Sequence, residues 1–207
     1  MIERPMEWDL WHRYDLILGM DEAGRGPMAG PLCVAGVILP RHYRNDLIDD
    51  SKRLSEKKRE LLFHEIRRDA LWYQIVMVPE AEIDEYNIYQ ADKRAMEAIA
   101  REAMCNYVLT DAMPIVTSHP VEAIVHGDHR AISIAAASIL AKVARDDYMK
   151  TLDELYPGYG LGKNKGYPTR EHKEALINKG ILPVHRRTWK PVRDQLGAEE
   201  AKQQRLF

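Results

Sequence analysis

The sequence predicts an α/β or α+β domain with a central mixed β-sheet flanked by helices. Short apolar runs typical of buried strands come first in the chain, and later runs alternate with segments of helical periodicity. The 207 residues, 45% hydrophobic and 30% charged, are enough to bury a sizeable core. These features favour a soluble globular protein with one domain, or with one domain and a small appendage.

Five segments have the composition of β-strands, rich in β-branched and other apolar residues. Glycine and proline separate the first two segments and favour a turn between them. Each segment is also short enough to be a strand rather than a buried helix. The five expected strands are residues 16–21, 32–39, 71–78, 107–110 and 121–125.

Five other segments have the periodicity of helices. Ser55 is a suitable N-cap for the first, in which Leu62, Ile66 and Ala70 share one face. An apolar stripe marks a second helix, and Gly180 is placed to end the last. The expected helices are residues 55–70, a short one opened by Pro79, 89–104 with its stripe of Ala91, Ala95, Ile99 and Ala103, 130–155 and 169–179, while 197–207 form an exposed helix or a frayed tail.

Charge is unevenly distributed along the chain. The net charge of −2 and an isoelectric point near 6.5 do not by themselves indicate a nucleic-acid-binding protein. Between residues 160 and 193, however, nine Lys or Arg outnumber two Glu, which gives this segment a charge of +7. The segment is either an ordinary solvated surface or a surface for phosphates.

The chain lacks the features of a secreted or membrane protein. No apolar run approaches the ~20 residues of a membrane span. The first 16 residues mix acids, bases and two tryptophans, unlike a signal or transit peptide. Cys33 and Cys105 are too few for a disulfide framework. We therefore expect a cytoplasmic protein with no membrane partner. A monomer is the default expectation, since no coiled-coil pattern or exposed apolar stripe stands out.

Residues 24–29 match the dinucleotide-binding pattern G-x-G-x-x-G/A. In dinucleotide-binding proteins this pattern opens a helix, whose N-terminal amides hold the pyrophosphate. Here Pro27 and Gly30 interrupt the segment, and the residues that follow have the composition of a strand. The context therefore excludes a nicotinamide cofactor.

Two acids, Asp21 and Glu22, end the first expected strand just before a glycine turn that carries Arg25. The arginine suits phosphate, whereas the acids would repel it. A divalent cation removes this contradiction, because carboxylate oxygens are ligands for Mg²⁺ and Mn²⁺; an ordinary polar turn is the alternative. Since adjacent strand residues point to opposite faces, both acids can face one metal only if the strand twists locally.

Two further acids could complete such a site. Asp111 ends the fourth expected strand, where side chains often project into a ligand cleft, although a turn-forming Asp is the alternative. Asp128 precedes the longest expected helix, where Asp is also a favoured N-cap. His126 and His129 suggest zinc, but no Cys or Glu nearby has a zinc-ligand spacing, so we do not expect zinc.

Five motifs occur in order over residues 18–192. They are MDEAGRGPMAGP at 20–31, DSKRLS at 50–55, TDAMP at 110–114, GD at 127–128 with IAAASILAKV at 134–143, and NKGYPT at 164–169 followed by His172, Pro183, His185 and Arg186. Together they resemble the bacterial ribonuclease HII family. One such motif is weak evidence, whereas five in register over nearly the whole chain are specific.

The resemblance implies a ribonuclease H-like fold with a small C-terminal helical appendage. The catalytic domain would span residues 1–157, and a helical substrate-binding region, packed on it as one unit, would span 158–207. The family's four catalytic, metal-binding carboxylates correspond to Asp21, Glu22, Asp111 and Asp128. The substrate-binding residues that we expect on this basis are Gly24, Arg25, Gly26, Ser51, Lys52, Lys142, Lys165 and Tyr167.

The resemblance also implies an activity. Enzymes of this family hydrolyse the RNA strand of RNA/DNA hybrids and cut 5′ to ribonucleotides embedded in duplex DNA, leaving a 3′-hydroxyl and a 5′-phosphate. Gly24–Gly26 match the turn that senses the ribose 2′-hydroxyl, and Tyr167 matches the tyrosine that packs against the sugar at an RNA–DNA junction. The cofactor would be Mn²⁺ or Mg²⁺, two per site with substrate bound.

Two other functions are compatible with an acidic cluster on this fold. An integrase- or resolvase-like nuclease would cut all-DNA substrates, and the Gly-Arg-Gly turn argues against it. A hybrid-binding module with a decayed site is the non-enzymatic alternative, and the presence of all four carboxylates argues against that.

Overall fold

The computed structural model describes residue 2, residues 4–48 and residues 54–204, with side-chain burial as far as residue 198. Within this part of the chain one mixed sheet has the strand order β3-β2-β1-β4-β5. The central strand β1 (Ile17–Ala23) pairs antiparallel with β2 (Leu32–Ile38) and parallel with β4 (Tyr107–Asp111). The two edges are β3 (Trp72–Val78), antiparallel to β2, and β5 (Val121–Ile124), parallel to β4.

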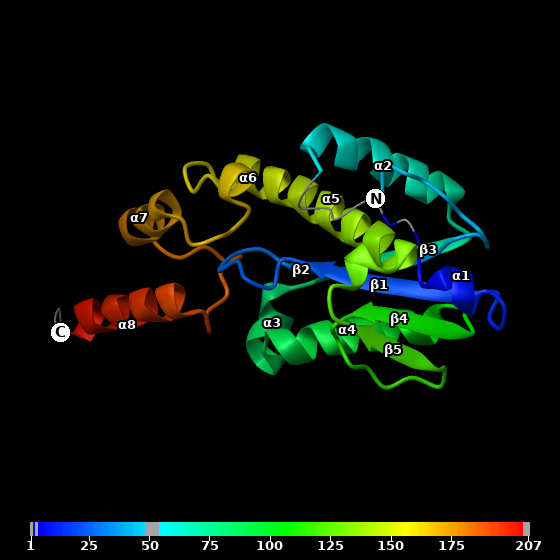
Figure 1. Cartoon of the computed structure of the whole chain (residues 1–207). Helices are drawn as coiled ribbons and strands as arrows, with labels where there is room; N and C mark the ends of the chain where they lie inside the picture. The colour runs from blue at the N-terminus through cyan, green and yellow to red at the C-terminus, as the bar shows by residue number, and fades with distance from the viewer. Residues whose placement is uncertain (1, 3, 49–53, 205–207) are drawn as a thin grey trace.

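Helices cover both faces of this sheet (Figure 1). On one face α5 (Ile132–Leu155) packs on β1 and β2, with α2 (Glu56–Asp69) beside it, and on the other lies α4 (Ile88–Glu102). The predicted mixed sheet flanked by helices is therefore confirmed. The other helical segments are α1 (Glu7–Leu10), α3 (Glu80–Tyr86), the 3₁₀ turn η1 (Gly127–His129), α6 (Leu161–Asn164), α7 (Arg170–Lys179) and α8 (Lys190–Gln204).

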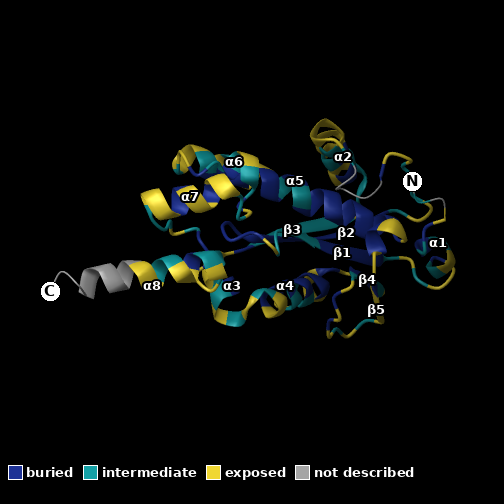
Figure 2. Cartoon of the chain, turned by 60° about the vertical axis from the view of Figure 1, so that its left-hand side comes forward, coloured by how far each residue is buried: buried dark blue, intermediate teal, exposed yellow. Residues whose placement is uncertain are grey.

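The core is split into two layers by the sheet. Figure 2 shows the first half of α5 and the central strands as buried, and all seven residues of β2 are buried. Leu18, Met20 and Val34 pack toward α4 in one cluster, whereas Cys33 and Ala35 pack toward α2 and α5 in the other. This division follows from the alternation of side chains along each strand.

Small residues let α5 lie directly against β1. A Cβ on Gly19 would lie 2.3 Å from the backbone carbonyl carbon of Ser133, which is too close for two non-bonded carbon atoms. A stretch of buried alanines follows along α5, including Ala135, Ala136 and Ala137. Because of this close approach, side chains of α5 such as Ser138 line the same pocket as Asp21 and Glu22 at the end of β1.

The first turn of α5 is capped by a residue distant in the sequence. The buried Glu7 carboxylate accepts hydrogen bonds from the backbone N–H groups of Ile132 (3.2 Å) and Ser133 (2.8 Å), and from the Ser133 hydroxyl. Asp128 lies in η1, before the start of α5. The N-cap residue of α5 is Ala131, whose own side chain makes no capping hydrogen bond. The alternative role of Asp128 as the N-cap of this helix is therefore excluded.

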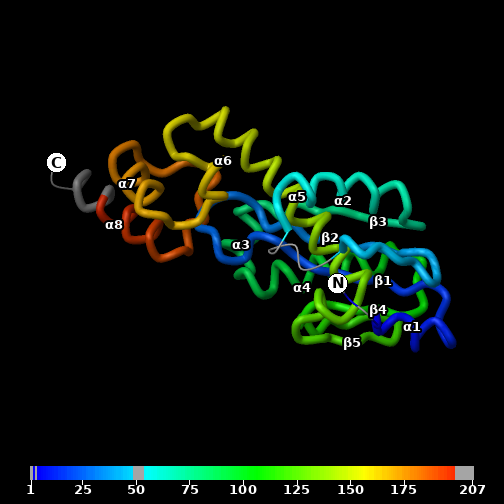
Figure 3. The backbone as a smooth tube through the Cα atoms, turned by 45° about the horizontal axis from the view of Figure 1, so that its top comes forward, coloured from blue at the N-terminus to red at the C-terminus, as the bar shows by residue number. Residues whose placement is uncertain are grey.

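The C-terminal segment folds back on the loop between β1 and β2. The backbone of Met28 donates to Gly166 O (2.9 Å), that of Gly30 donates to Val184 O (2.8 Å), and Ala29 forms a β-bridge with His185. Figure 3 shows α6, α7 and α8 gathered at the end of the molecule away from α1 and β5. The division into units at residue 157 stays a prediction.

The expected elements are found to within about two residues, except the last. Helix α8 begins at Lys190, whereas the expected tail began at residue 197. Val192 explains the difference, because its buried side chain packs with Met28 and Leu176 and so fixes the first turn. The residues that follow Val192 are mostly polar, so the sequence pattern does not indicate that a helix begins here.

Replacing Gly19 with Ala should lower the free energy of unfolding by about 1–3 kcal/mol or more, because the new methyl group meets rigid backbone. Gly197→Ala is the control, since a Cβ there meets nothing within 4 Å and Ala favours helix. Urea unfolding measures both. A Gly19→Ala variant as stable as the wild type would contradict the close packing of α5 on β1.

Candidate active site

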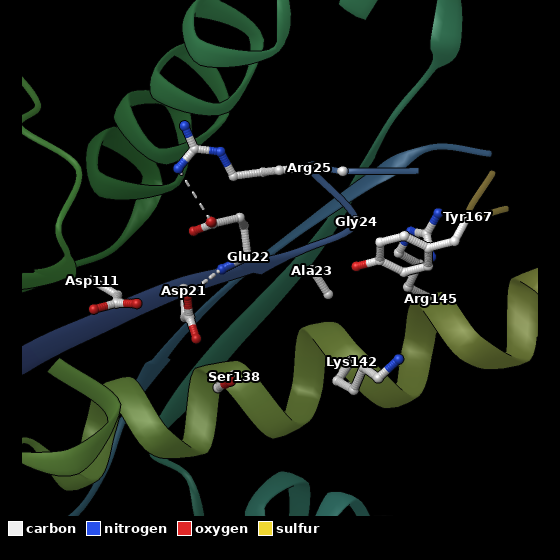
Figure 4. Close-up of a pocket in the computed structure, with 11 residues that line it drawn as sticks. Asp21, Glu22, Ala23, Gly24, Arg25, Asp111, Ser138, Lys142, Arg145 and Tyr167 are labelled. Carbon is white, nitrogen blue, oxygen red and sulfur yellow. Dashed lines mark hydrogen bonds and ion pairs between the residues drawn. The ribbon is translucent and has the colours of Figure 1, made fainter. Parts of the chain in front are cut away.

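A pocket of about 320 Å³ opens beside the end of β1 (Figure 4). It lies where three parts of the fold meet: the ends of β1 and β4, the middle of α5, and the glycine loop that follows β1. Its lining is mostly polar and charged. The residues that line it are Asp21, Glu22, Ala23, Gly24, Arg25, Gly26, Asp111, Ser138, Lys142, Arg145 and Tyr167.

The parallel pairing of β1 with β4 brings Asp21 and Asp111 together. Met20 is in register with Thr110, so the next residue of each strand is an acid at the same edge of the sheet. The backbone N–H of Gly127 donates to Asp111 Oδ1 (2.8 Å) and holds that carboxylate in place. The two acids predicted from strand ends therefore share one pocket.

Asp21 and Glu22 point to opposite sides of β1. Pairing with β2 stays regular as far as Ala23, so the local twist that would turn both acids to one side is absent from β1. In Figure 4 Asp21 points toward Ser138 on α5, and Glu22 points toward Arg25. Asp21 is 5% exposed, and the side chain of Glu22 is 13% exposed.

The acids are buried and lie close enough to repel one another. Burial, followed by the charges of Glu22 and Asp111, raises the pKa of Asp21 well above its usual value. Burial also raises the pKa of Glu22, although the Arg25 guanidinium opposes that shift. Glu22 Oε2 is buried without a hydrogen-bond partner. Excess negative charge and an unsatisfied oxygen both favour binding of a cation here.

Asp128 lies close to this group but does not line the pocket. It is buried in η1, directly after the glycine whose N–H holds Asp111. Across the described residues, no three acidic, His or Cys side chains are already arranged to hold a metal ion. The orientation of Glu22 toward Arg25 is consistent with this finding.

The expected substrate-binding residues fall into three groups. Gly24, Arg25, Gly26, Lys142 and Tyr167 line the pocket together with the acids. Lys165 lies outside the lining, and its carbonyl oxygen accepts a hydrogen bond from Arg145 (2.9 Å). Ser51 and Lys52 lie outside the described residues.

Two buried arginines, for which the sequence predicted no such role, hold the glycine loop. Arg145 on α5 donates to the carbonyls of Pro31 (2.9 Å), Ala29 (3.3 Å) and Lys165. Arg186 donates to the carbonyls of Gly30 (3.0 Å), Arg25 (3.1 Å) and Gly24 (2.6 Å). Arg145 stands within the apolar pattern of α5, and this position is the feature of the sequence that could have indicated its burial.

Arg186 corrects the interpretation of the basic segment. We counted it among nine cations of one phosphate surface, but it is 0% exposed and its donors are used by backbone carbonyls. Lys163, Arg170, Lys173, Lys179, Arg187, Lys190 and Arg193 are exposed, and Lys165 is half-buried. The solvated charge of the segment is accordingly smaller than the sequence count.

Two neutral histidines fix the backbone of Tyr167. His172 Nδ1 donates to Tyr167 O (2.9 Å), which leaves Nε2 to accept from His185 Nε2 (3.1 Å). His185 Nδ1 accepts from the backbone N–H of Leu182 (2.9 Å), so each ring has one defined tautomer. Burial and the neighbouring His172 lower the pKa of His185 to about 4. Tyr167 itself stays 46% exposed at the pocket mouth.

Solved structures with this fold define the class of protein. The crystal structure of ribonuclease H2 from Pyrococcus horikoshii matches with a TM-score of 0.79 and 25% identity, over 89% of this chain and 99% of that one. Ribonuclease HII from Archaeoglobus fulgidus, solved in complex with PCNA, matches with a TM-score of 0.73 and 28% identity over 84% and 95% of the two chains. The fold is that of a ribonuclease H-like enzyme.

Sequence comparison identifies the family. The model of the family "Ribonuclease HII" matches residues 18–192. Ribonuclease HII of Enterococcus faecalis is 49% identical over 183 residues, which cover 87% of this chain and 72% of the relative. That of Desulfitobacterium hafniense is 47% identical over 194 residues, or 92% and 75%. The chain belongs to the ribonuclease HII family, whose members are divalent-metal-dependent endoribonucleases of the ribonuclease H class.

No helix in the described part of the chain is both long and apolar enough to cross a membrane.

Replacing Asp21 with Asn should stabilise the cation-free protein at neutral pH. The raised pKa means that the folded state holds the Asp21 proton more tightly than the unfolded chain, so stability falls as pH rises above the ordinary value of 3.8. Asn removes this loss, and the melting temperature in EDTA should rise by about 2–4 °C per kcal/mol recovered. The difference should disappear as pH falls toward 3.8.

The exposed Asp46 supplies a charge-matched control, because Asp46→Asn removes one acid that does not line the pocket of Asp21. Its melting temperature should follow that of the wild type. An Asp21→Asn protein that is less stable than the wild type at pH 8 in EDTA would contradict the repulsion within the pocket.

Proposed function

We propose that the protein cleaves the RNA strand of RNA/DNA hybrids and nicks duplex DNA on the 5′ side of an embedded ribonucleotide, leaving a 3′-hydroxyl and a 5′-phosphate. The observation that carries this proposal is the shared pocket of Asp21, Glu22 and Asp111 with the turn Gly24–Gly26. Acids suit a reaction that needs divalent cations, and the glycine turn suits close approach of a nucleic-acid backbone.

Asp21, Glu22, Asp111 and Asp128 would together hold the cations. The donors are all oxygen, which favours Mg²⁺ or Mn²⁺ over zinc. The buried, unpartnered Oε2 of Glu22 and the raised pKa of Asp21 support the fit. Two cations, when bound, would supply an activated water and stabilise the leaving oxygen. The backbone N–H of Gly127 orients Asp111 for this task.

The glycine turn and Tyr167 would recognise the ribonucleotide. Gly24 has a φ of 101°, and a Cβ there would meet Arg145 Nε at 2.0 Å, so no other residue fits. A Cβ on Gly26 would lie 3.2 Å from the Tyr167 ring, which places the ring beside the turn. The 2′-hydroxyl distinguishes RNA from DNA, and backbone groups of this turn can bind it.

The C-terminal region, residues 158–207, would carry the substrate backbone. Its exposed lysines and arginines offer charge for phosphates, and its contacts with the glycine loop link it to the pocket. Binding through this surface should weaken as salt rises. We further propose that the protein works as a cytoplasmic monomer in the removal of ribonucleotides from DNA.

The direct test uses three labelled duplexes of one sequence, with Mg²⁺ or Mn²⁺. We expect cuts within the RNA of a hybrid and one nick 5′ to a single embedded ribonucleotide, with the all-DNA duplex intact. The absence of cleavage of both ribonucleotide substrates would refute the proposal. Cleavage of the all-DNA duplex would favour an integrase- or resolvase-like nuclease instead.

Replacing Asp111 with Asn should reduce the cleavage rate by roughly two to three orders of magnitude, the loss typical of a preorganised electrostatic group. Duplex binding should persist, because the basic residues and the glycine loop are unchanged. Single-turnover cleavage and fluorescence anisotropy measure the two effects. If Asp111→Asn keeps full activity, the assignment of the catalytic carboxylates is wrong.

A further inference from the structure

A buried carboxylate that the proposed reaction does not use lies beside the pocket. Asp92 is on α4, on the face of the sheet opposite α5, and it is 0% exposed. Both of its carboxylate oxygens are buried without a hydrogen-bond partner. Burial of an ionisable group with no hydrogen bond costs stability, so a role other than packing is expected for it.

Asp92 forms an ion pair with the guanidinium of Arg25. Arg25 Nε lies 3.6 Å from Asp92 Oδ2, while Arg25 Nη1 lies 3.5 Å from Glu22 Oε1. The Arg25 side chain is 41% exposed and lines the pocket. Figure 4 shows Arg25 and Glu22 together on the side of β1 away from α5.

We propose that Asp92 is a positioning residue that holds the Arg25 guanidinium at the pocket mouth, between Glu22 and the sugar–phosphate backbone of an incoming duplex. This inference rests on the proposed function, since it assigns Arg25 a place in substrate binding. Asp92 anchors the guanidinium through Nε, and this leaves the terminal nitrogens for Glu22 and for a phosphate. An arginine fixed at one edge loses less freedom when it binds.

The Arg25 guanidinium lies between two buried carboxyl groups in this arrangement. Burial, and then the charge of Glu22, raises the pKa of Asp92 to about 8, and Arg25 opposes this shift. When Glu22 turns toward a cation, Asp92 keeps Arg25 in place. Without Asp92 the guanidinium would pair with Glu22 alone, which would both move Arg25 and occupy a proposed metal ligand.

Loss of Asp92 and loss of Arg25 should have different effects on stability. Removal of Asp92 leaves a partly exposed arginine that water can solvate, whereas removal of Arg25 leaves a fully buried carboxylate without its cation. A pair that only stabilised the fold would make both losses harmful. The proposal instead expects Asp92→Asn to keep or raise the melting temperature and Arg25→Ala to lower it.

The experiment measures binding, kinetics and stability at pH 8.5, above the value that burial gives Asp92. The substrate is a duplex with one embedded ribonucleotide. For Asp92→Asn we expect the dissociation constant in EDTA and the KM with Mn²⁺ to rise on the order of tenfold, while kcat changes less than about twofold. Arg25→Lys should behave similarly, because an ammonium cannot bridge two carboxylates as a fork does.

Two further variants make the result specific. In an Arg25→Ala background, Asp92→Asn should leave KM unchanged and restore part of the lost melting temperature, because the two residues act as a unit. Glu102→Gln removes one negative charge from the far end of the same helix, where it contacts Gln74, and should match the wild type.

Three results would overturn the inference: an unchanged dissociation constant and KM for Asp92→Asn, equal effects of Asp92→Asn with and without Arg25, or a fall in melting temperature as large as that of Arg25→Ala. Failure of the wild-type protein to bind or cut the duplex would instead refute the proposed function. The melting temperatures of Asp92→Asn, Arg25→Ala and the double variant would still report on the pairing of Asp92 with Arg25.

Discussion

Two buried guanidinium groups hold the loop on which the whole site depends. Residues 24–31 have no regular ladder to satisfy their carbonyls, and a buried loop with unpaired carbonyls would not be stable. Arg145 and Arg186 supply the missing donors from opposite sides, one from α5 and one from the C-terminal segment. Each arginine in turn needs these carbonyls, because its charge is removed from water. The glycine turn, α5 and the C-terminal segment are thereby fixed as one unit.

The site combines this rigid frame with unresolved negative charge. Asp21, Glu22 and Asp111 are held by a strand register and by backbone hydrogen bonds, which set their positions whether or not their charges are balanced. In the described residues the nearest cation to Glu22 is Arg25, which also serves Asp92. Repulsion between the carboxylates lowers the stability of the cation-free protein, and a bound divalent cation would reduce that repulsion. The same carboxylates therefore affect both the stability of the pocket and its proposed chemistry.

Sequence patterns predicted the features that depend on local spacing. Short apolar runs located the strands, and the acids at their ends predicted side chains that project into a ligand cleft. The structure adds that β1 and β4 are parallel neighbours, which brings Asp21 and Asp111 into one pocket. The pleat argument for Asp21 and Glu22 also holds, since the two side chains point apart. Long-range contacts could not be predicted in this way. Nothing near Glu7 indicates that it caps α5, and Arg186 looks like one more surface cation until its carbonyl partners are known. Asp92 is a charged residue directly beside Ala91 of the apolar stripe of α4. The sequence pattern does not show that its side chain is buried.

The central claim is that four carboxylates and the glycine turn form one metal-dependent site for a ribonucleotide. The most direct measurement is a crystal structure of the protein with Mn²⁺ and a duplex that contains one ribonucleotide, using Asp111→Asn if cleavage must be prevented. We expect cations between Asp21, Glu22 and residues 111 and 128, with the 2′-hydroxyl against the turn Gly24–Gly26 and the sugar against Tyr167. Cations bound elsewhere, or a duplex held away from this turn, would contradict it.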